Sequence, residues 1–107
     1  MAGLPPYTFL TLFRAEANNT DMVEEFLRQL KHTLEAHPAF GDTSLLLGPT
    51  PAPMAKRAGK ARWQLLLQTQ SRKTMQQLLH SARPAISLLP LAKKVRWSMD
   101  IEPQDFS

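Results

Sequence analysis

The segment from Gly48 to Gln68, GPTPAPMAKRAGKARWQLLLQ, restricts the possible folds more than any other part of the chain. It opens with three alternating prolines, Pro49, Pro51 and Pro53. Proline has no amide donor and a φ of about −65°, which excludes a helix and predicts a stiff, extended backbone. Basic residues follow, and Trp63–Gln68 then forms an apolar run bounded like a buried strand. We therefore expect residues 48–62 to form a projecting, proline-rich basic loop that leads into a strand.

Two other stretches carry apolar residues at the i, i+3, i+4 and i+7 spacing of amphipathic helices. The first stripe consists of Val23, Phe26, Leu27, Leu30 and Leu34, and the second of Met75, Leu78, Leu79, Ala82 and Ile86. Residues 18–21 and Ser71 supply N-caps, and Pro38 stops the first helix. Pro84 lies inside the second stripe, and because the spacing continues past it we expect a kinked helix rather than an end.

Alternating or short apolar runs predict three more strands, at residues 7–15, 43–47 and 93–101. The resulting order, β-α-β-β-α-β, is that of an α+β, ferredoxin-like split βαβ fold with two helices on one face of a four-stranded antiparallel sheet. Alternation then places four polar side chains on the other, open face, which we expect to be polar and basic: Arg62, Gln64, Gln68 and Arg96.

The two tryptophans bear on what such a face could bind. The alternation of side chains along each strand places Trp63 and Trp97 with the leucines on the helix side of the sheet, although a register slip of one residue would reverse this. RNA-binding sheets of this topology stack bases on aromatic rings of the open face. An independent RNA-binding module is therefore disfavoured.

The positive charge is concentrated in one part of the chain. Residues 43–99 contain ten Lys and Arg and no acid, whereas residues 1–42 contain three bases and six acids and residues 100–107 contain three acids. A basic segment of this kind attracts polyanions such as phosphate backbones or acidic peptides. A solvated surface that only aids solubility is the alternative, and it accounts less well for the lack of acids.

Several classes of protein are not supported by the composition. A chain of 107 residues is expected to form one domain, and without cysteine it has no disulfides, thiolate nucleophile or common zinc site. No apolar run reaches the length of about 18 residues that a membrane span needs, and we expect a cytoplasmic monomer. Three scattered histidines predict no metal site, and no phosphate loop or nucleophile motif is present. We expect no catalytic residue and no cofactor in this domain.

Arg72 and Gln76 form a candidate site for a carboxylate. Their i, i+4 spacing puts a forked cation and an amide on one face of the second helix, beside Lys73, and free amides of the first turn would add to an anion site. The same residues also suit the solvated side of an amphipathic helix, and the spacing alone favours that interpretation.

The sequence resembles the C-terminal domains of primosomal replication-restart DNA helicases, the PriA family (primosomal protein N′). The resemblance rests on LGPTPAPMAKRAGKARWQLLLQ (residues 47–68), SRKTMQQLL (71–79) and LPLAKKVRWSMDIEP (89–103), and more weakly on LPPYTFLTLFRAEA (4–17). It covers most of the chain, and residues 1–3 are interpreted as a remnant from an excised domain.

The resemblance implies a parent that is an ATP-dependent 3′ to 5′ helicase, with ATP and zinc sites outside this chain, and a fold like that of a small-subunit ribosomal protein. It implies that this domain contacts fork DNA and shares a site for the acidic C-terminal tail of single-stranded DNA-binding protein with the helicase core. The isolated domain would then hold half of the tail site and bind the tail weakly. We assign DNA contacts to Lys56, Arg57, Lys60, Arg62 and Arg96, and tail contacts to Arg72, Gln76 and Lys73. The alternative function is a structural domain that braces the helicase core.

Overall fold

The computed structural model describes residues 8–57 and 59–101, without the side chains of residues 54–57. Its elements follow the predicted order: β1 (Phe9–Ala17), α1 (Thr20–Glu35), β2 (Ser44–Arg57), β3 (Lys60–Thr69), α2 (Arg72–Ser87), the 3-10 helix η1 (Pro90–Lys93) and β4 (Arg96–Ile101). The predicted ferredoxin-like fold is confirmed. The expected remnant at residues 1–3 lies outside the described residues.

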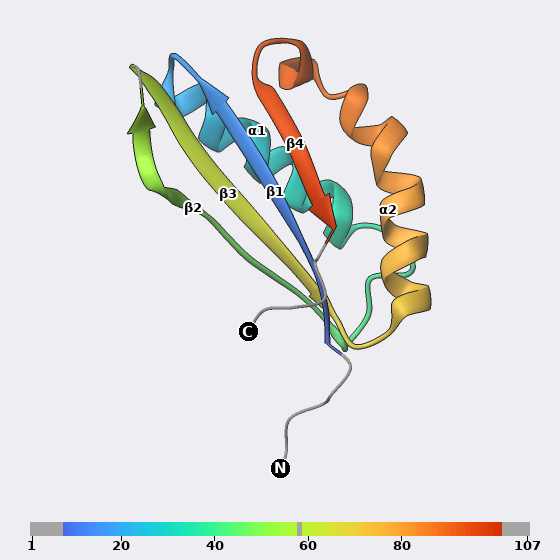
Figure 1. Ribbon diagram of the computed structural model, residues 1–107. Coiled ribbons are helices and arrows are strands. Elements are labelled where there is room, and N and C mark those ends of the chain that lie inside the picture. The colour runs from blue at the N-terminus through green and yellow to red at the C-terminus, as the bar shows by residue number, and fades with distance from the viewer. Residues whose placement is uncertain (1–7, 58, 102–107) are drawn as a thin grey trace.

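The four strands form one antiparallel sheet in the order β2-β3-β1-β4, with both helices on one face (Figure 1). β1 therefore lies between β3 and β4. β2 and β4 are the edge strands. The face turned away from the helices is the open face.

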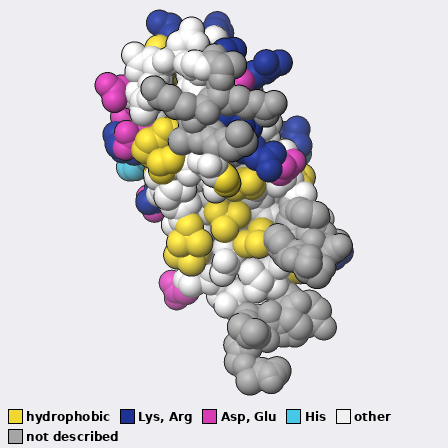
Figure 2. Space-filling view, turned by 60° about the vertical axis from the view of Figure 1, so that its left-hand side comes forward, with side chains coloured by type: hydrophobic (Ala, Val, Ile, Leu, Met, Phe, Trp, Pro, Cys, Tyr) yellow, Lys and Arg dark blue, Asp and Glu magenta, His cyan; other side chains and the backbone are white. Residues whose placement is uncertain are grey.

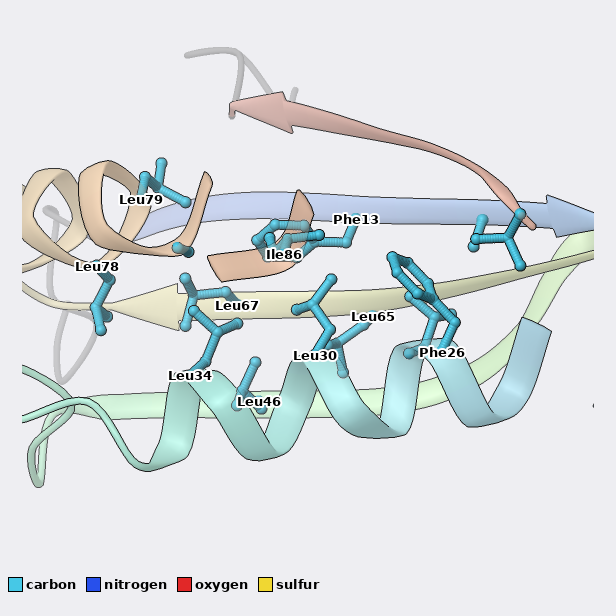
Figure 3. Close-up of a cluster of buried hydrophobic side chains, with 14 of the residues drawn as sticks. Phe13, Phe26, Leu30, Leu34, Leu46, Leu65, Leu67, Leu78, Leu79 and Ile86 are labelled. Carbon is cyan, nitrogen blue, oxygen red and sulfur yellow. The ribbon is translucent and has the colours of Figure 1, made fainter. Parts of the chain in front are cut away.

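A single hydrophobic core lies between the helices and the sheet (Figure 3). Both predicted helical stripes are buried in it, and Phe13, Leu65 and Leu67 face them from the central strands. Trp63 and Trp97 are half-buried and pack against this core, and the ring centroids of Trp97 and Phe26 are 6.3 Å apart. The predicted phase of both tryptophans is therefore confirmed.

The helix ends follow local chemistry. The Asn19 side chain accepts a hydrogen bond from the Met22 amide, and the Ser71 hydroxyl accepts one from the Thr74 amide, so each helix has a polar N-cap. α2 continues past Pro84 to Ser87, as the unbroken apolar spacing predicted.

The predicted loop at residues 48–62 is wrong. Residues 48–57 belong to β2 and residues 60–62 to β3, these strands pair as a hairpin, and β2 reaches ten residues beyond the strand expected to end at residue 47. The tip of the hairpin also does not project far, because Ala61 pairs with Ala17 at the end of β1. An edge strand tolerates the prolines because it needs few amide donors on its outer side.

β4 is shorter than expected, because Pro90 starts a 3-10 helix and the strand begins only at Arg96. The alternation of this strand puts Val95 and Ile101 on the same side as Trp97. Val95 is buried, but Ile101 is 57% exposed at the end of this edge strand.

Gly48 interrupts the pairing of β2. Its φ is 112°, and the register with β3 shifts between Leu47 and Thr50. Glycine adopts this conformation without the steric cost of a Cβ atom. At this bulge the Gly48 carbonyl accepts a hydrogen bond from the Lys31 side chain of α1.

Candidate functional site

The half of the open face nearest the hairpin tip carries a row of charged residues across three strands. Glu16 of β1 is paired with Arg62 of β3 on one side and with Arg96 of β4 on the other. One step further along the strands, Arg14 lies between Gln64 and Ser98. The sheet register therefore gathers three arginines that are far apart in the sequence.

These residues line a groove of about 710 Å³ on the open face. The pairing of β2 with β3 is interrupted between Pro51 and Lys56, and Ala52 and Pro53 of this interrupted segment form the wall of the groove on the β2 side. The polar side chains that line it are Arg14, Glu16, Arg62, Gln64, Arg96 and Ser98. We call this cavity the arginine groove.

Two acids partly neutralise the arginine groove. Arg14 donates a hydrogen bond of 2.7 Å to Asp100, and the Arg62 Nε lies 3.5 Å from the Glu16 carboxylate. Such pairs at a protein surface contribute only about 0 to 1 kcal/mol. The three arginines thus remain available to an anionic ligand.

The other half of the open face is apolar, which corrects the prediction that this face is polar and basic throughout. The register places five leucines on neighbouring positions of β1, β2 and β3: Leu10, Leu12, Leu45, Leu47 and Leu66. Leu45 and Leu47 are 45% and 47% exposed. Figure 2 brings forward the side on which β2 lies, and hydrophobic side chains gather across its middle with Lys and Arg mainly above them. We call these five residues the leucine patch.

A second cavity of about 290 Å³ lies where α2 begins. Arg72 and Gln76 both line it, and the Arg72 guanidinium lies 5.5 Å from the centre of the Phe9 ring. Its other lining residues are apolar: Leu10, Met75, Leu79 and Ile101. Lys73 is exposed in the same helical turn but does not line this cavity, so the predicted trio is only partly brought together. We call this cavity the α2 pocket.

The remaining predicted DNA contacts lie at the hairpin. Lys60 is exposed at the start of β3, and Lys56 and Arg57 occupy the last two positions of β2, opposite Ala61 and Lys60. The side chains of Lys56 and Arg57 lie outside the described part of the structure. The backbone positions nevertheless put the three basic residues at the same end of the sheet as Arg62.

Sequence reasoning missed two members of the arginine groove and the apolar wall of the α2 pocket. Arg14 and Glu16 alternate with Phe13 and Ala15, so their exposure on the open face was predictable, but their neighbours depend on the strand register. Phe9 and Ile101 reach the α2 pocket from opposite ends of the chain, and no local pattern indicates that meeting.

The described residues contain neither a metal-binding cluster nor a membrane-spanning helix. No three His, Asp or Glu side chains gather there into a group able to hold a metal ion. No helix of residues 8–57 and 59–101 is long and apolar enough to cross a membrane.

Comparison with known proteins gives a consistent result. A family model described as the primosomal protein N C-terminal domain matches residues 1–104. The chain is 42% identical over 105 residues to the replication restart protein PriA of Haemophilus influenzae, covering 98% of this chain and 14% of that protein. It is 31% identical over 101 residues to the replication restart protein PriA of Buchnera aphidicola, covering 94% of this chain and 14% of that protein. The chain therefore spans about one seventh of the length of these curated relatives.

The fold also recurs in proteins of unrelated sequence. A dimeric ferredoxin-like protein from an uncultured marine organism superimposes with a TM-score of 0.58 at 9% identity, covering 92% of this chain and 98% of that one. At this identity the likeness concerns the fold alone.

Proposed function

The chain belongs to the primosomal protein N C-terminal domain family, and from this premise we propose that it is a non-catalytic binding module of a replication restart protein. It binds replication-fork DNA with its basic surface and contributes to the site for the acidic tail of single-stranded DNA-binding protein. The parent is an ATP-dependent 3′ to 5′ DNA helicase whose ATP and zinc sites lie in the rest of the protein.

The observation that carries DNA binding is the clustering of arginines on the open face. Arg62 and Arg96 line one groove together with Arg14, at the same end of the sheet as the basic hairpin residues. Arginine binds phosphate oxygens with a planar fork of donors, and phosphate contacts do not depend on base sequence. We propose that this surface tracks a fork arm, with Lys56, Arg57 and Lys60 contacting phosphates next to the arginine groove.

The direct test is a titration of fluorescein-labelled forked DNA with the 107-residue chain at several salt concentrations. Each phosphate contact contributes about 0.9 to the negative slope of log K against log salt, so five contacts predict a slope of about −4 to −5. The function would be ruled out if the chain binds the forked DNA no more tightly than an unrelated protein of equal net charge does, and with no steeper dependence on salt.

The α2 pocket supports the second part of the proposal. A suitable probe is a short acidic peptide that ends in phenylalanine, which presents carboxylates next to an apolar ring. The pocket offers the Arg72 fork and the Gln76 amide beside the apolar side chains of Phe9, Met75 and Ile101. Lys73 lies outside the pocket and supplies long-range attraction to the acidic residues that precede the terminus.

A nuclear magnetic resonance titration of the isotope-labelled chain with such a peptide tests the pocket. We expect shift changes at Arg72, Gln76 and Phe9 and none at the arginine groove. The affinity should be weak, because the helicase core supplies the other half of the site in the proposed parent. Shifts spread evenly over all basic residues would indicate attraction without a site.

The leucine patch favours a further role, a bracing contact with the helicase core of the same parent. The chain covers only 14% of the length of its relatives, and half-exposed leucines such as Leu45 and Leu47 gain about 25 cal/mol for each Å² of apolar surface that a partner covers. If the domain only braces the core, the isolated chain will bind neither DNA nor peptide beyond the level expected from its charge.

A further inference from the structure

A carboxylate stands in the middle of the arginine groove. Glu16 is opposite Arg62 on one neighbouring strand and opposite Arg96 on the other, and all three side chains line the groove. Glu16 is 25% exposed and Arg62 29% exposed, so both side chains are partly buried, and the Glu16 carboxylate lies 3.5 Å from the Arg62 Nε. Across the strands the groove therefore presents a donor, an acceptor and a donor.

A site for phosphates alone does not explain this arrangement. A negative charge between two arginines repels a phosphodiester and weakens the groups that would hold it. Glu16 also does not serve the core, since it lies on the face opposite the helices. A ligand that fits all three side chains must offer a hydrogen-bond donor between acceptors.

We propose that the arginine groove binds an unpaired nucleobase that has a ring N–H beside a carbonyl group, namely thymine or guanine. Thymine presents O4, N3–H and O2 in a line, which complements Arg62, Glu16 and Arg96, and guanine presents O6 beside N1–H. Adenine and cytosine carry no ring N–H on this edge. Proteins commonly read the Watson–Crick edges of unpaired bases by hydrogen bonds.

The rest of the groove fits a nucleotide. Its volume of about 710 Å³ lies within the range of roughly 300 to 1,000 Å³ found for small-molecule sites. Arg14 lies two residues along β1 from Glu16, about 7 Å away on the same face, a separation that suits the phosphate of the bound nucleotide. The walls come from Leu12 and from Ala52 and Pro53 of the interrupted β2 segment.

This inference rests on the proposed DNA binding and adds base selection to it. In a duplex the ring N–H of thymine and guanine is engaged in the base pair, so only a single-stranded stretch or an opened end can enter the groove. The arginine groove would thus distinguish the unpaired part of a fork, whereas the basic residues of the β2–β3 hairpin contact phosphates of any DNA strand.

The test compares three single-stranded 12-mers of equal charge by fluorescence anisotropy with the 107-residue chain: oligo-dT, oligo-dC and an oligo-dT in which each thymine carries a methyl group on N3. We expect dT to bind about fivefold or more tighter than dC and than the methylated strand, since a good base contact discriminates by roughly fivefold to 150-fold. The methylated strand keeps the carbonyls and removes only the N–H.

The matched variants are Glu16→Met, which keeps the length of the side chain and removes the acceptor, and Glu35→Met on the exposed end of α1. Glu16→Met should abolish the preference for dT and strengthen binding of dC, because one negative charge leaves the groove. Glu35→Met should strengthen the binding of all three oligonucleotides slightly and equally. Circular dichroism verifies that both variants fold, and Arg96→Ala, at an exposed position, provides a second variant that should reduce the preference for dT.

The outcomes separate this inference from DNA binding itself. If the chain binds dT, dC and the methylated strand equally, or if the preference survives Glu16→Met, base selection by the groove is wrong and DNA binding stands. If the chain binds none of the strands and no forked DNA, the proposed function fails as well.

Discussion

The Lys31 ammonium donates a hydrogen bond of 3.0 Å to the backbone carbonyl of Gly48, which joins the C-terminal half of α1 to the bulge in β2. Gly48 is also the point where the register between β2 and β3 shifts, just before the segment that forms the wall of the arginine groove. The Gly48 bulge and its contact with Lys31 therefore lie close in sequence to the segment that forms this wall.

Replacing Gly48 by alanine should destabilise the chain by about 2 kcal/mol or more. The backbone φ is 112°, and an added Cβ would lie 3.0 Å from the Gln64 carbonyl oxygen and 3.1 Å from the Thr50 amide. Urea denaturation measures the loss. Gly41→Ala is the matched control, because a Cβ there meets nothing within 4 Å, and equal losses at both sites would contradict the strained bulge.

The three consecutive leucines of β2 should respond differently to alanine. Leu46 is 8% exposed and packs in the core, so Leu46→Ala should cost about 2 to 3 kcal/mol. Leu45 and Leu47 point to the open face, and their replacement should change the free energy of unfolding by less than about 1 kcal/mol. Similar values for all three leucines would mean that the register of β2 differs from the structure.

Arg62→Ala combined with Arg96→Ala should weaken binding to forked DNA. If both arginines contact phosphates, the salt slope becomes shallower by about 1.8, and if they hold an unpaired base instead, the slope changes little. The control is Arg28→Ala combined with Arg83→Ala, which removes the same charge from the exposed surface of the helices. If the two double variants behave alike, net charge and not the arginine groove accounts for DNA binding.

Arg72→Lys should reduce the affinity for an acidic peptide ending in phenylalanine by roughly tenfold, since lysine keeps the charge and loses the bidentate fork. Lys73→Ala removes a full charge from the same turn but lies outside the α2 pocket, so its effect should stay within about twofold. Peptide titrations followed by nuclear magnetic resonance measure both. A larger effect at Lys73 than at Arg72 would place the peptide elsewhere.

The order of elements and the core were predictable because each apolar stripe obeys a clear period. Leu30 and Leu78 are buried where helical spacing placed them, and Trp97 lies on the face that its alternation with Arg96 indicated. The hairpin was missed because prolines and basic residues are typical of loops, and only the position of β2 at the edge of the sheet makes them compatible with a strand.

The candidate sites were less predictable than the fold. Arg62 and Arg96 were assigned to the open face by alternation, but that Glu16 lies between them follows from the register of three strands. Likewise, the spacing of Arg72 and Gln76 revealed a common helix face without the Phe9 ring that turns this face into a pocket. Local patterns indicate which way a side chain points, and tertiary pairing decides what it meets.

The prolines of β2 have a consequence for how the molecule behaves in a crowded solution. Pro49, Pro51 and Pro53 lie on an edge strand, where any incoming chain would need amide donors to extend the ladder. Proline has none, so this edge is a poor template for a neighbouring chain, and intermolecular β-stacking from that side is blocked. These prolines, of which Pro53 also lines the arginine groove, thus help to protect a sheet with exposed leucines from aggregation.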